Sequence, residues 1–247
     1  MTLSTGRADD QPAGMSVPID AVLFDLDGTL VATMEPWDRC WFDFAAGHGH
    51  AWTDADRRRT HGHGDWADHL AEVCGIDSAA RVIEECTGVM IEQVRAGRIE
   101  LLPGVKELVR TATNAGAMGV VSASPGRFVH ATLEHFGLHR HWDLTLTRED
   151  LIETKPDPAP YLHAAARLGV FPEHCVAVED SAAGIRSAAT AGMRVLAIPS
   201  WADHPHPAEA VLAEYLAPDA ARADLWLRTA LEPTIAELRA LSIANNS

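Results

Sequence analysis

The stretch "VLFDLDGTLV", residues 22 to 31, decides how the rest of the chain is interpreted. Residues 21–24 are apolar without polar alternation, which predicts a short strand buried on both faces. Asp25 and Asp27 follow where this strand ends, and side chains two residues apart point the same way on an extended backbone. Gly28 then lets the chain turn away. An ordinary strand-end turn also uses Asp and Gly, but it needs one Asp rather than a pair that faces one way.

The composition is that of a globular protein with one large domain or two modest ones. The chain has 247 residues, of which 47% are apolar and 22% charged, and this length provides a sizeable core. A formal charge of -15 argues against nucleic acid as a partner, because phosphates require a basic surface. An anionic substrate would also need a local cation to overcome this field, and a bound metal ion is the obvious candidate.

The N-terminus and the distribution of apolar residues predict neither a secretory signal nor a membrane span. No run of residues approaches the length of a membrane span, so we expect no membrane partner. The N-terminal "MTLSTGRADDQPAGMS" lacks the basic start and apolar stretch of a secretory signal, and residues 1–17 are predicted to be a disordered extension. The four cysteines show no C-x-x-C spacing, which favours free thiols in a cytoplasmic protein.

The order of the expected elements indicates an α/β domain with a helical insertion. Apolar residues recur at helical spacing in segments 35–47, 65–75 and 78–97, each closed by a glycine. Short apolar strands and helical segments then alternate, which implies right-handed crossovers and a parallel sheet. The strands are 116–124, 141–147, 173–180 and 193–198, and the helical segments are 104–115, 125–137, 158–169 and 181–191.

This alternation is interrupted between the first and second strands by the helical block. We therefore predict a Rossmann-like parallel-sheet core, residues 18–32 and 103–247, with an inserted helical cap, residues 33–102. A last helix, at about residues 233–242, is expected to pack on the sheet.

Polar side chains follow the other strands at the edge where Asp25 is expected. In open parallel sheets, ligands bind outside the carboxyl ends of the strands. Each polar group alone has an ordinary explanation, as a helix cap, a solvated charge or an acid at a helix start, but together they predict a single site. They are Ser122 and Ser124 after the second strand, Lys155 after the third, and Glu179 and Asp180 after the fourth.

These groups suit phosphoryl transfer. The carboxylates of Asp25, Asp180 and Glu179, with a main-chain carbonyl near Asp27, form an oxygen-rich and incomplete shell of the kind that Mg²⁺ prefers. Lys155 supplies a compact positive charge. Asp25 can attack phosphorus and form an aspartyl phosphate, whereas Asp27 is placed to protonate the leaving oxygen and then deprotonate water. The remaining donors to the phosphate are Ser122 and the backbone amides that follow it, starting at Ala123.

Four motifs, "DLDGT", "VVSAS", "KPDP" and "VEDSAAGI", resemble those of haloacid dehalogenase superfamily phosphohydrolases, in the same order and from about residue 19 onward. The resemblance implies a Rossmann-like core with Asp25 as nucleophile and Asp27 as acid and base. It further implies Ser122 and Lys155 on the phosphate. Asp180, with Glu179 directly or through water, would bind Mg²⁺.

The helical insertion is similar to the cap of the subgroup that contains sugar-phosphate and glycerol-phosphate phosphatases and β-phosphoglucomutase. The segment "THGHGDWADHL" resembles their "HGR" or "HGK" cap segment, with His63 where a basic residue is usual. The chain departs from this family at Ala32, where an Asp is frequent, and at Trp37, which replaces a histidine of the mutase. The residues expected to meet the substrate are Thr29, Ser124, His61, Gly62 and His63.

The function that follows is a Mg²⁺-dependent phosphatase acting on a small phosphate monoester, a sugar or polyol phosphate. The alternative is a phosphosugar mutase like β-phosphoglucomutase, against which Thr29 and Trp37 weigh. Dehalogenation needs no acid at Asp27, so the presence of this acid argues against a dehalogenase. A phosphonate-cleaving enzyme needs a cap lysine that forms a Schiff base, and residues 31–103 contain no lysine. A protein that only binds phosphate or Mg²⁺ would not need Asp27, so the presence of this residue argues against a non-catalytic binder.

Two matters stay open on the sequence alone. Five histidines of the expected cap, two of them in each of "HGHAW" and "HGHGD", raise the alternative of a second metal ion, although solvated histidines are commoner. The sequence determines neither the identity of the substrate nor the oligomeric state, although it favours a monomer. The five histidines are His48, His50, His61, His63 and His69.

Overall fold

The computed structural model describes residues 17–60, 64–198 and 208–232. Residues 1–16 of the expected N-terminal extension, the His61–His63 segment and the expected helix at 233–242 therefore lie outside the described residues. Within the described residues, six strands form one sheet in the order β3-β2-β1-β4-β5-β6, and every neighbouring pair is parallel. The strands are β1 (Ala21–Phe24), β2 (Ala117–Val121), β3 (Leu144–Leu146), β4 (Cys175–Glu179), β5 (Arg194–Ala197) and β6 (Tyr215–Leu216).

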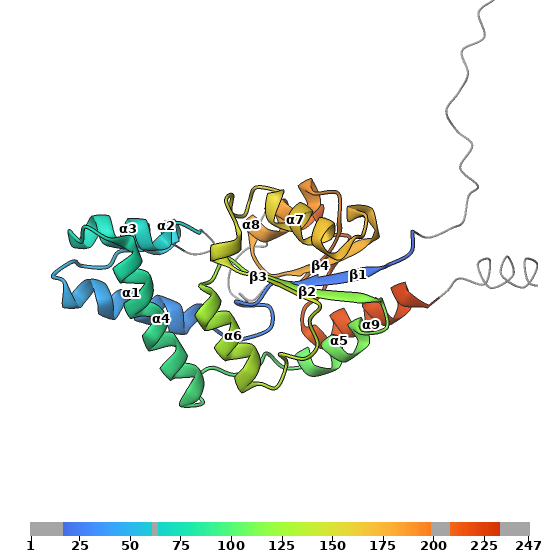
Figure 1. Ribbon diagram of the computed structural model, residues 1–247, viewed down its shortest axis with the longest axis horizontal. Coiled ribbons are helices and arrows are strands. Elements are labelled where there is room, and N and C mark those ends of the chain that lie inside the picture. The colour runs from blue at the N-terminus through green and yellow to red at the C-terminus, as the bar shows by residue number, and fades with distance from the viewer. Residues whose placement is uncertain (1–16, 61–63, 199–207, 233–247) are drawn as a thin grey trace, which may run out of the picture.

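Helices cover both faces of the sheet (Figure 1). All four residues of β1 are fully buried, and they alternate between two hydrophobic clusters. Val22 and Phe24 belong to the larger cluster, whereas Ala21 and Leu23 belong to the smaller one. The larger cluster includes residues of α5 (Val105–Ala112), α6 (Gly126–His135) and α9 (Ala220–Leu231), and the smaller includes residues of α7 (Ala159–Leu168) and α8 (Ala182–Thr190). The predicted α/β class with a parallel, Rossmann-like sheet is confirmed.

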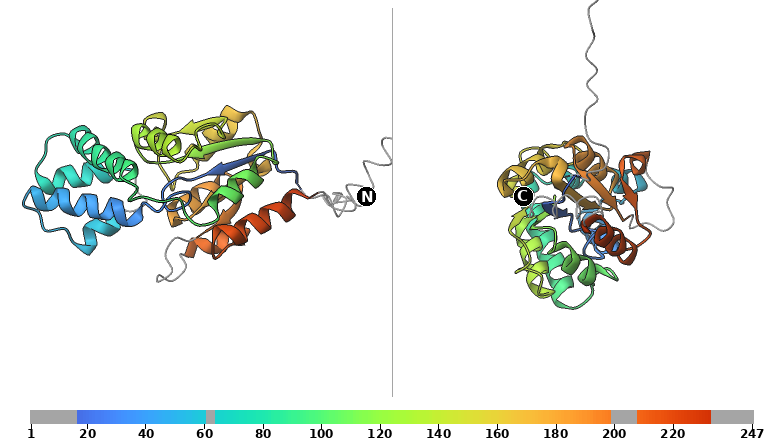
Figure 2. Two further views of the ribbon diagram at one scale, coloured as in Figure 1. Left: turned by 90° about the horizontal axis from the view of Figure 1, so that it is seen from below. Right: turned by 90° about the vertical axis from the view of Figure 1, so that its right-hand side faces the viewer.

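Most of the residues between β1 and α5 form a group of helices set apart from the sheet (Figure 2). Two linkers join this group to the core and run side by side, with the amide of Ala32 donating to the carbonyl of Glu100 and that of Leu102 to the carbonyl of Leu30. We call these two linkers the hinge. The helices are α1 (Met34–Gly47), α2 (Asp54–Thr60), α3 (Trp66–Cys74) and α4 (Ala79–Arg95).

The ends of these helices agree with the glycine signals in two cases out of three. Gly75 is the left-handed C-cap of α3, with φ of 66°, and Gly97 has φ of 68° two residues after α4. At the end of α1 the residue in this conformation is Gly49, with φ of 78°, whereas Gly47 is the last helical residue. None of the described helices is long and apolar enough to cross a membrane.

Among the described α-helices and strands, α2, β6 and α9 were not predicted individually. β6 has only two residues and pairs with β5 alone, so no periodicity marks it. α9 begins at Ala220 and is preceded by its N-cap Asp219, whose side chain accepts from the amide of Arg222. The helix packs along α5, and Thr111 donates a hydrogen bond to the buried Asp224.

Candidate active site

The end of β1 places Asp25 and Asp27 at the carboxyl edge of the sheet. The amide of Asp25 donates to the carbonyl of Val178, which ties this residue to the neighbouring strand β4. After Asp27 the chain turns at Gly28, where φ is 81°, a conformation that favours glycine. The amide of Leu30 then donates back to the carbonyl of Leu26. Both carboxylates therefore extend from the short segment that links the end of β1 to this turn.

Lys155 lies at the centre of the site. Its Nζ donates to Asp25 Oδ1 at 2.6 Å, to Glu179 Oε1 at 2.5 Å and to the carbonyl of Val121 at 2.8 Å. The side chain is 5% exposed. Burial by itself lowers the pKa of Lys155, but the charges of Asp25 and Glu179 outweigh it and raise the pKa above its ordinary value. The lysine is therefore a fixed positive charge that joins the ends of three strands.

Glu179 is fully buried, and protein donors meet both of its oxygens. Oε1 accepts from Lys155 and from the hydroxyl of Tyr161, the latter at 2.7 Å. Oε2 accepts from the amides of Asp180 and Ser181 and from the Ser181 hydroxyl. This arrangement makes Glu179 an anchor for Lys155 and for the start of α8.

The carboxylates of Asp25, Glu179 and Asp180 form a group suited to a metal ion. One oxygen from each lies within 4.8 Å of the others, and all three residues are buried. Burial is the largest cause that raises the pKa of Asp25 well above its usual value; the charges of Glu179, Asp180 and Asp27 also raise it, against the opposing charge of Lys155. Three buried acids beside one lysine leave an excess of negative charge, which a hard divalent cation with oxygen ligands would neutralise.

Asp27 belongs to a second cluster. Its Oδ1 accepts from the Thr33 hydroxyl at 2.7 Å and from Trp37 Nε1 at 2.9 Å, and its Oδ2 accepts from the Ser124 hydroxyl at 2.6 Å. The Asp27 carboxylate is thus not a member of the acidic group. This leaves its main-chain carbonyl as the ligand to consider, as the sequence suggested.

The loop after β2 contributes the expected small polar residues. The amide of Ser124 donates to the hydroxyl oxygen of the buried Ser122 at 3.0 Å, which bends the backbone through Ala123. The Thr29 hydroxyl is also buried, and it has no partner among the described residues. The structure brings Ser124 to Asp27, whereas the roles of Ser122, Ala123 and Thr29 toward a substrate stay predictions.

Sequence reasoning missed three residues of this site. Tyr161 holds Glu179, and Thr33 and Trp37 hold Asp27. Tyr161 is one of only two tyrosines in the chain and follows Lys155 by six residues, which is a weak signal. Trp37 stood out as a departure from the mutase, but nothing in its spacing indicated a hydrogen bond to Asp27.

The described histidines of the helical insertion have structural partners. His50 Nε2 and His69 Nε2 lie 3.2 Å and 2.9 Å from opposite oxygens of the buried Asp56. His48 bonds to the carbonyl of Phe44. Among the described residues, the group of three acids in the core is the only one suited to a metal ion, so no second metal site is supported there. Beside the undescribed His61–His63 segment, a β-carbon at Gly64 would overlap the core residue Thr154.

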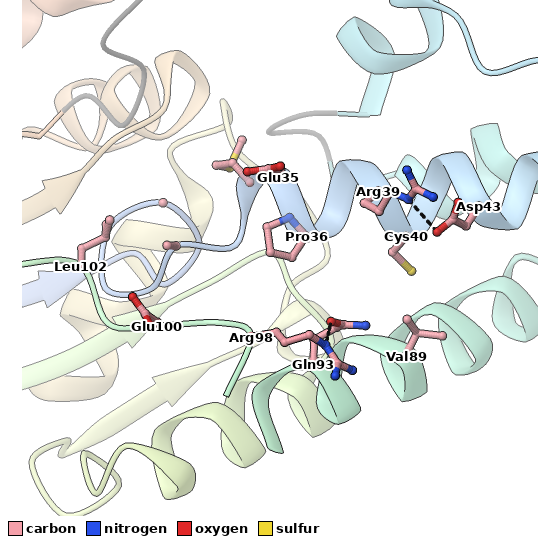
Figure 3. A pocket seen from close by; sticks show the side chains of 13 residues that line it. Glu35, Pro36, Arg39, Cys40, Asp43, Val89, Gln93, Arg98, Glu100 and Leu102 are labelled. Carbon is pink, nitrogen blue, oxygen red and sulfur yellow. Dashed lines mark hydrogen bonds and ion pairs between the residues drawn. The ribbon is translucent and has the colours of Figure 1, made fainter. Parts of the chain in front are cut away.

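A groove of about 540 Å³ lies between α1, α4 and the hinge. Figure 3 shows Arg39 and Asp43 of α1 on one side of it and Arg98 and Glu100 of the linker on the other. Both arginines already have partners within the chain, Asp43 for one and Gln93 for the other. No residue of the acidic group lines this groove, so it is a feature of the hinge and not of the candidate active site.

Known proteins resemble this chain in sequence and in fold. Hexitol phosphatase B of Escherichia coli (strain K12) is 33% identical over 206 residues, which cover 75% of this chain and 87% of that protein. CbbY from Rhodobacter sphaeroides, in a crystal structure with phosphate, is 27% identical with a TM-score of 0.71, over 82% of this chain and 95% of that one. A putative β-phosphoglucomutase from Thermotoga maritima is 25% identical with a TM-score of 0.65, over 85% and 99%.

A model of the haloacid dehalogenase-like hydrolase family matches residues 19–192. The predicted resemblance is confirmed by this match and by the solved relatives. The expected enzyme class, a haloacid dehalogenase-type phosphoric monoester hydrolase, is confirmed by the family together with the phosphatase relatives. The chain therefore belongs to the haloacid dehalogenase-like hydrolase family.

Proposed function

We propose that this enzyme is a Mg²⁺-dependent phosphatase that hydrolyses a small sugar or polyol phosphate through an aspartyl-phosphate intermediate. The observation that carries the proposal is the contact between Asp25 and Lys155, a nucleophile candidate bonded at 2.6 Å to a buried, fixed cation. A carboxylate in this position can form a bond to phosphorus while the lysine stabilises the charge of the transferred group.

In the first step, an oxygen of Asp25 forms a bond to phosphorus and the bond from phosphorus to the ester oxygen breaks. Asp27 donates a proton to that oxygen, so the alcohol leaves neutral. In the second step, Asp27 takes a proton from a water molecule, and the water oxygen attacks phosphorus. The bond from phosphorus to Asp25 breaks, inorganic phosphate leaves, and both aspartates return to their starting states.

The metal would be held by Asp25 and Asp180, with the main-chain carbonyl of Asp27. Mg²⁺, when bound, neutralises charge on the phosphate and on the carboxylates around it. We assign Glu179 to the support of Lys155 because protein donors meet both of its oxygens. A direct bond from Glu179 to the metal would have to compete with these donors.

Substrate selection is assigned to the helical cap, residues 33–102, with His61, Gly62 and His63 as its contact segment. Hexitol phosphatase B and the fructose-1-phosphate phosphatase YqaB of Escherichia coli (strain K12), which is 26% identical over 174 residues, are named for polyol and sugar phosphates. These names support a small polyhydroxylated monoester as substrate. A cytoplasmic location and a monomeric state stay predictions.

A phosphosugar mutase is the second candidate, favoured by the likeness to the putative β-phosphoglucomutase. Both enzymes would share the acids and the lysine of the core. They differ in what takes the phosphoryl group from Asp25: water in the phosphatase, and a sugar hydroxyl in the mutase.

The test is a screen of hexose, hexitol, glycerol and nucleoside monophosphates with Mg²⁺, measuring inorganic phosphate release. We expect stoichiometric phosphate and free alcohol from a hexitol or hexose phosphate. If a sugar phosphate is isomerised without release of inorganic phosphate, the enzyme is a mutase and not a phosphatase. No turnover of any monoester, by a folded protein that binds Mg²⁺, would refute both.

A further inference from the structure

The carboxylate of Asp27 is held by donors from three parts of the chain. Thr33 lies at the start of the helical insertion, Trp37 one turn later in α1, and Ser124 in the loop after β2. Thr33 and Trp37 meet the same oxygen, Oδ1, because the amide of Trp37 donates to the carbonyl of Thr33 in the first helical turn. Both oxygens of Asp27 are thereby oriented by the protein.

Trp37 differs from the two hydroxyl donors in its chemistry. An indole N–H can only donate, whereas a serine or threonine hydroxyl can rotate and accept. Oδ1 of Asp27 must therefore act as an acceptor toward Trp37, at 2.9 Å. The indole N–H cannot rotate to present a lone pair to Asp27, so this contact imposes one orientation on the Asp27 carboxylate.

The indole is also fixed by its surroundings. Trp37 is 4% exposed. Its ring centroid lies 5.6 Å from that of Trp41, 5.4 Å from that of Trp66 and 5.3 Å from that of Phe128. Trp41 and Trp66 belong to α1 and α3 of the helical insertion, and Phe128 belongs to α6 of the core. The indole therefore sits where the insertion meets the core, in a packed environment that permits few rotamers.

We propose that Trp37 is a positioning residue that fixes the acid-base carboxylate of Asp27 and couples its orientation to the placement of α1. This inference rests on the proposed function, in which Asp27 protonates the leaving oxygen. The coupling follows from geometry, because a displacement of α1 carries the indole with it and removes one of the two donors to Oδ1.

The consequence depends on the leaving group. An alkoxide or a basic phenolate must be protonated as it leaves, so its release requires a well-oriented acid. The p-nitrophenolate ion is stable without a proton. A change that only disorients Asp27 should therefore slow phenyl phosphate far more than p-nitrophenyl phosphate, whereas general damage to the site should slow both equally.

The experiment compares kcat/KM for these two esters with Mg²⁺, because this ratio reports on steps up to release of the phenol and not on the later attack of water. Trp37→Phe keeps an aromatic ring but removes the N–H. We expect a loss of about 10-fold for phenyl phosphate, which is part of the 10²- to 10⁴-fold typical of general acid catalysis, and about 2-fold or less for p-nitrophenyl phosphate. The matched control is Trp41→Phe in the same helix and aromatic stack, which should leave the ratio of the two esters unchanged.

A second variant keeps the test decisive if Trp37→Phe has a folding defect. Benzothienylalanine, incorporated at position 37, has the shape of tryptophan but carries sulfur in place of the N–H. It should reproduce the selective loss for phenyl phosphate. Equal losses on both esters for this variant, or a selective loss of the same size in Trp41→Phe, would overturn the inference.

Asp27→Asn separates the inference from the proposed function. This variant should show the largest selective loss, because it removes the acid itself. If it does, and neither replacement at Trp37 is selective, the inference fails while the assignment of Asp27 stands. If Asp27→Asn is not selective, the assignment fails and the inference fails with it.

Discussion

Gly184, in the first turn of α8, lies directly against the carboxylate of Glu179 at the end of β4. A β-carbon at position 184 would overlap the carboxylate carbon and both of its oxygens. The absence of a side chain there lets Ser181 bond to Oε2 of Glu179 while its hydroxyl oxygen also accepts from the amide of Gly184. The placement of Glu179, and through it of Lys155, thus depends on a glycine that carries no chemistry.

Gly184→Ala should destabilise the protein, although alanine favours helices by about 1 kcal/mol over glycine. Forcing a methyl group into a packed and bonded carboxylate typically costs about 1–3 kcal/mol, and the shift of Glu179 should lower kcat. Urea unfolding measures the first effect. The matched control is Gly88→Ala inside α4, where a β-carbon meets no atom within 4 Å, and it should stabilise by about 0.5–1 kcal/mol. The same sign for both substitutions would contradict the proposed role of Gly184.

Asp25→Asn should abolish turnover and leave the fold intact, because an amide neither attacks phosphorus nor offers a carboxylate to a metal. Asp27→Asn should instead slow the steps that transfer a proton, by about 10²- to 10⁴-fold. Rapid quenching with a ³²P-labelled substrate measures the difference. Label should remain on wild-type protein and on Asp27→Asn, and not on Asp25→Asn. Full activity of Asp25→Asn would remove this residue from the mechanism.

Lys155→Arg should be far from conservative. The ammonium donates to Asp25, Glu179 and a main-chain carbonyl from one buried position, whereas a planar guanidinium needs more room and a different geometry. We expect kcat to fall by about 100-fold, in line with the loss of one preorganised electrostatic contact. Lys106, the only other lysine, is exposed in α5, and Lys106→Arg should leave kcat and KM unchanged. Near-normal kinetics for Lys155→Arg would place this lysine outside the catalytic site.

Mg²⁺ should raise the Tm of the protein in the absence of substrate. Ligand at 100 times its Kd stabilises the folded state by about 2.7 kcal/mol. Burial and the neighbouring carboxylates raise the pKa of Asp25, so protons compete with the metal up to a higher pH than for an ordinary aspartate. The rise in Tm should therefore grow as the pH increases from about 5 to about 8.

Asp180→Asn tests whether the rise in Tm with Mg²⁺ depends on the buried acidic group, since it removes one acid of that group. The variant should show little or no rise in Tm with Mg²⁺. Asp77→Asn, at an exposed position between α3 and α4, should respond like the wild type. If the Tm of the wild-type protein does not change with Mg²⁺ across this pH range, the result argues against a resident magnesium ion.

Much of the core was predictable because its signals are local. Continuous apolar residues mark β1 and β4, and an amphipathic segment lies between successive strands. The parallel arrangement follows from that alternation, and it places the residues that follow the strands at one edge. Asp25, Lys155, Glu179 and Asp180 could therefore be assigned to one site by their positions in the sequence, and the tertiary structure brings these four together.

The edge strand and the last described helix were not predictable in the same way. β6 consists of Tyr215 and Leu216, too short for an alternating pattern to form. It is a strand only because β5 offers unpaired main-chain groups beside it. α9 depends similarly on packing along α5.

Only the tertiary structure decides which donors meet the acids. The bond from Trp37 to Asp27 requires α1 to pack beside the β1 loop, and the bond from Tyr161 to Glu179 requires α7 to lie under the end of β4. Sequence motifs specify residue types along the chain, and local periodicity specifies helices and strands. Hydrogen bonds between separate elements depend instead on the distance and rotation at which packed side chains hold those elements, and these are properties of the whole core.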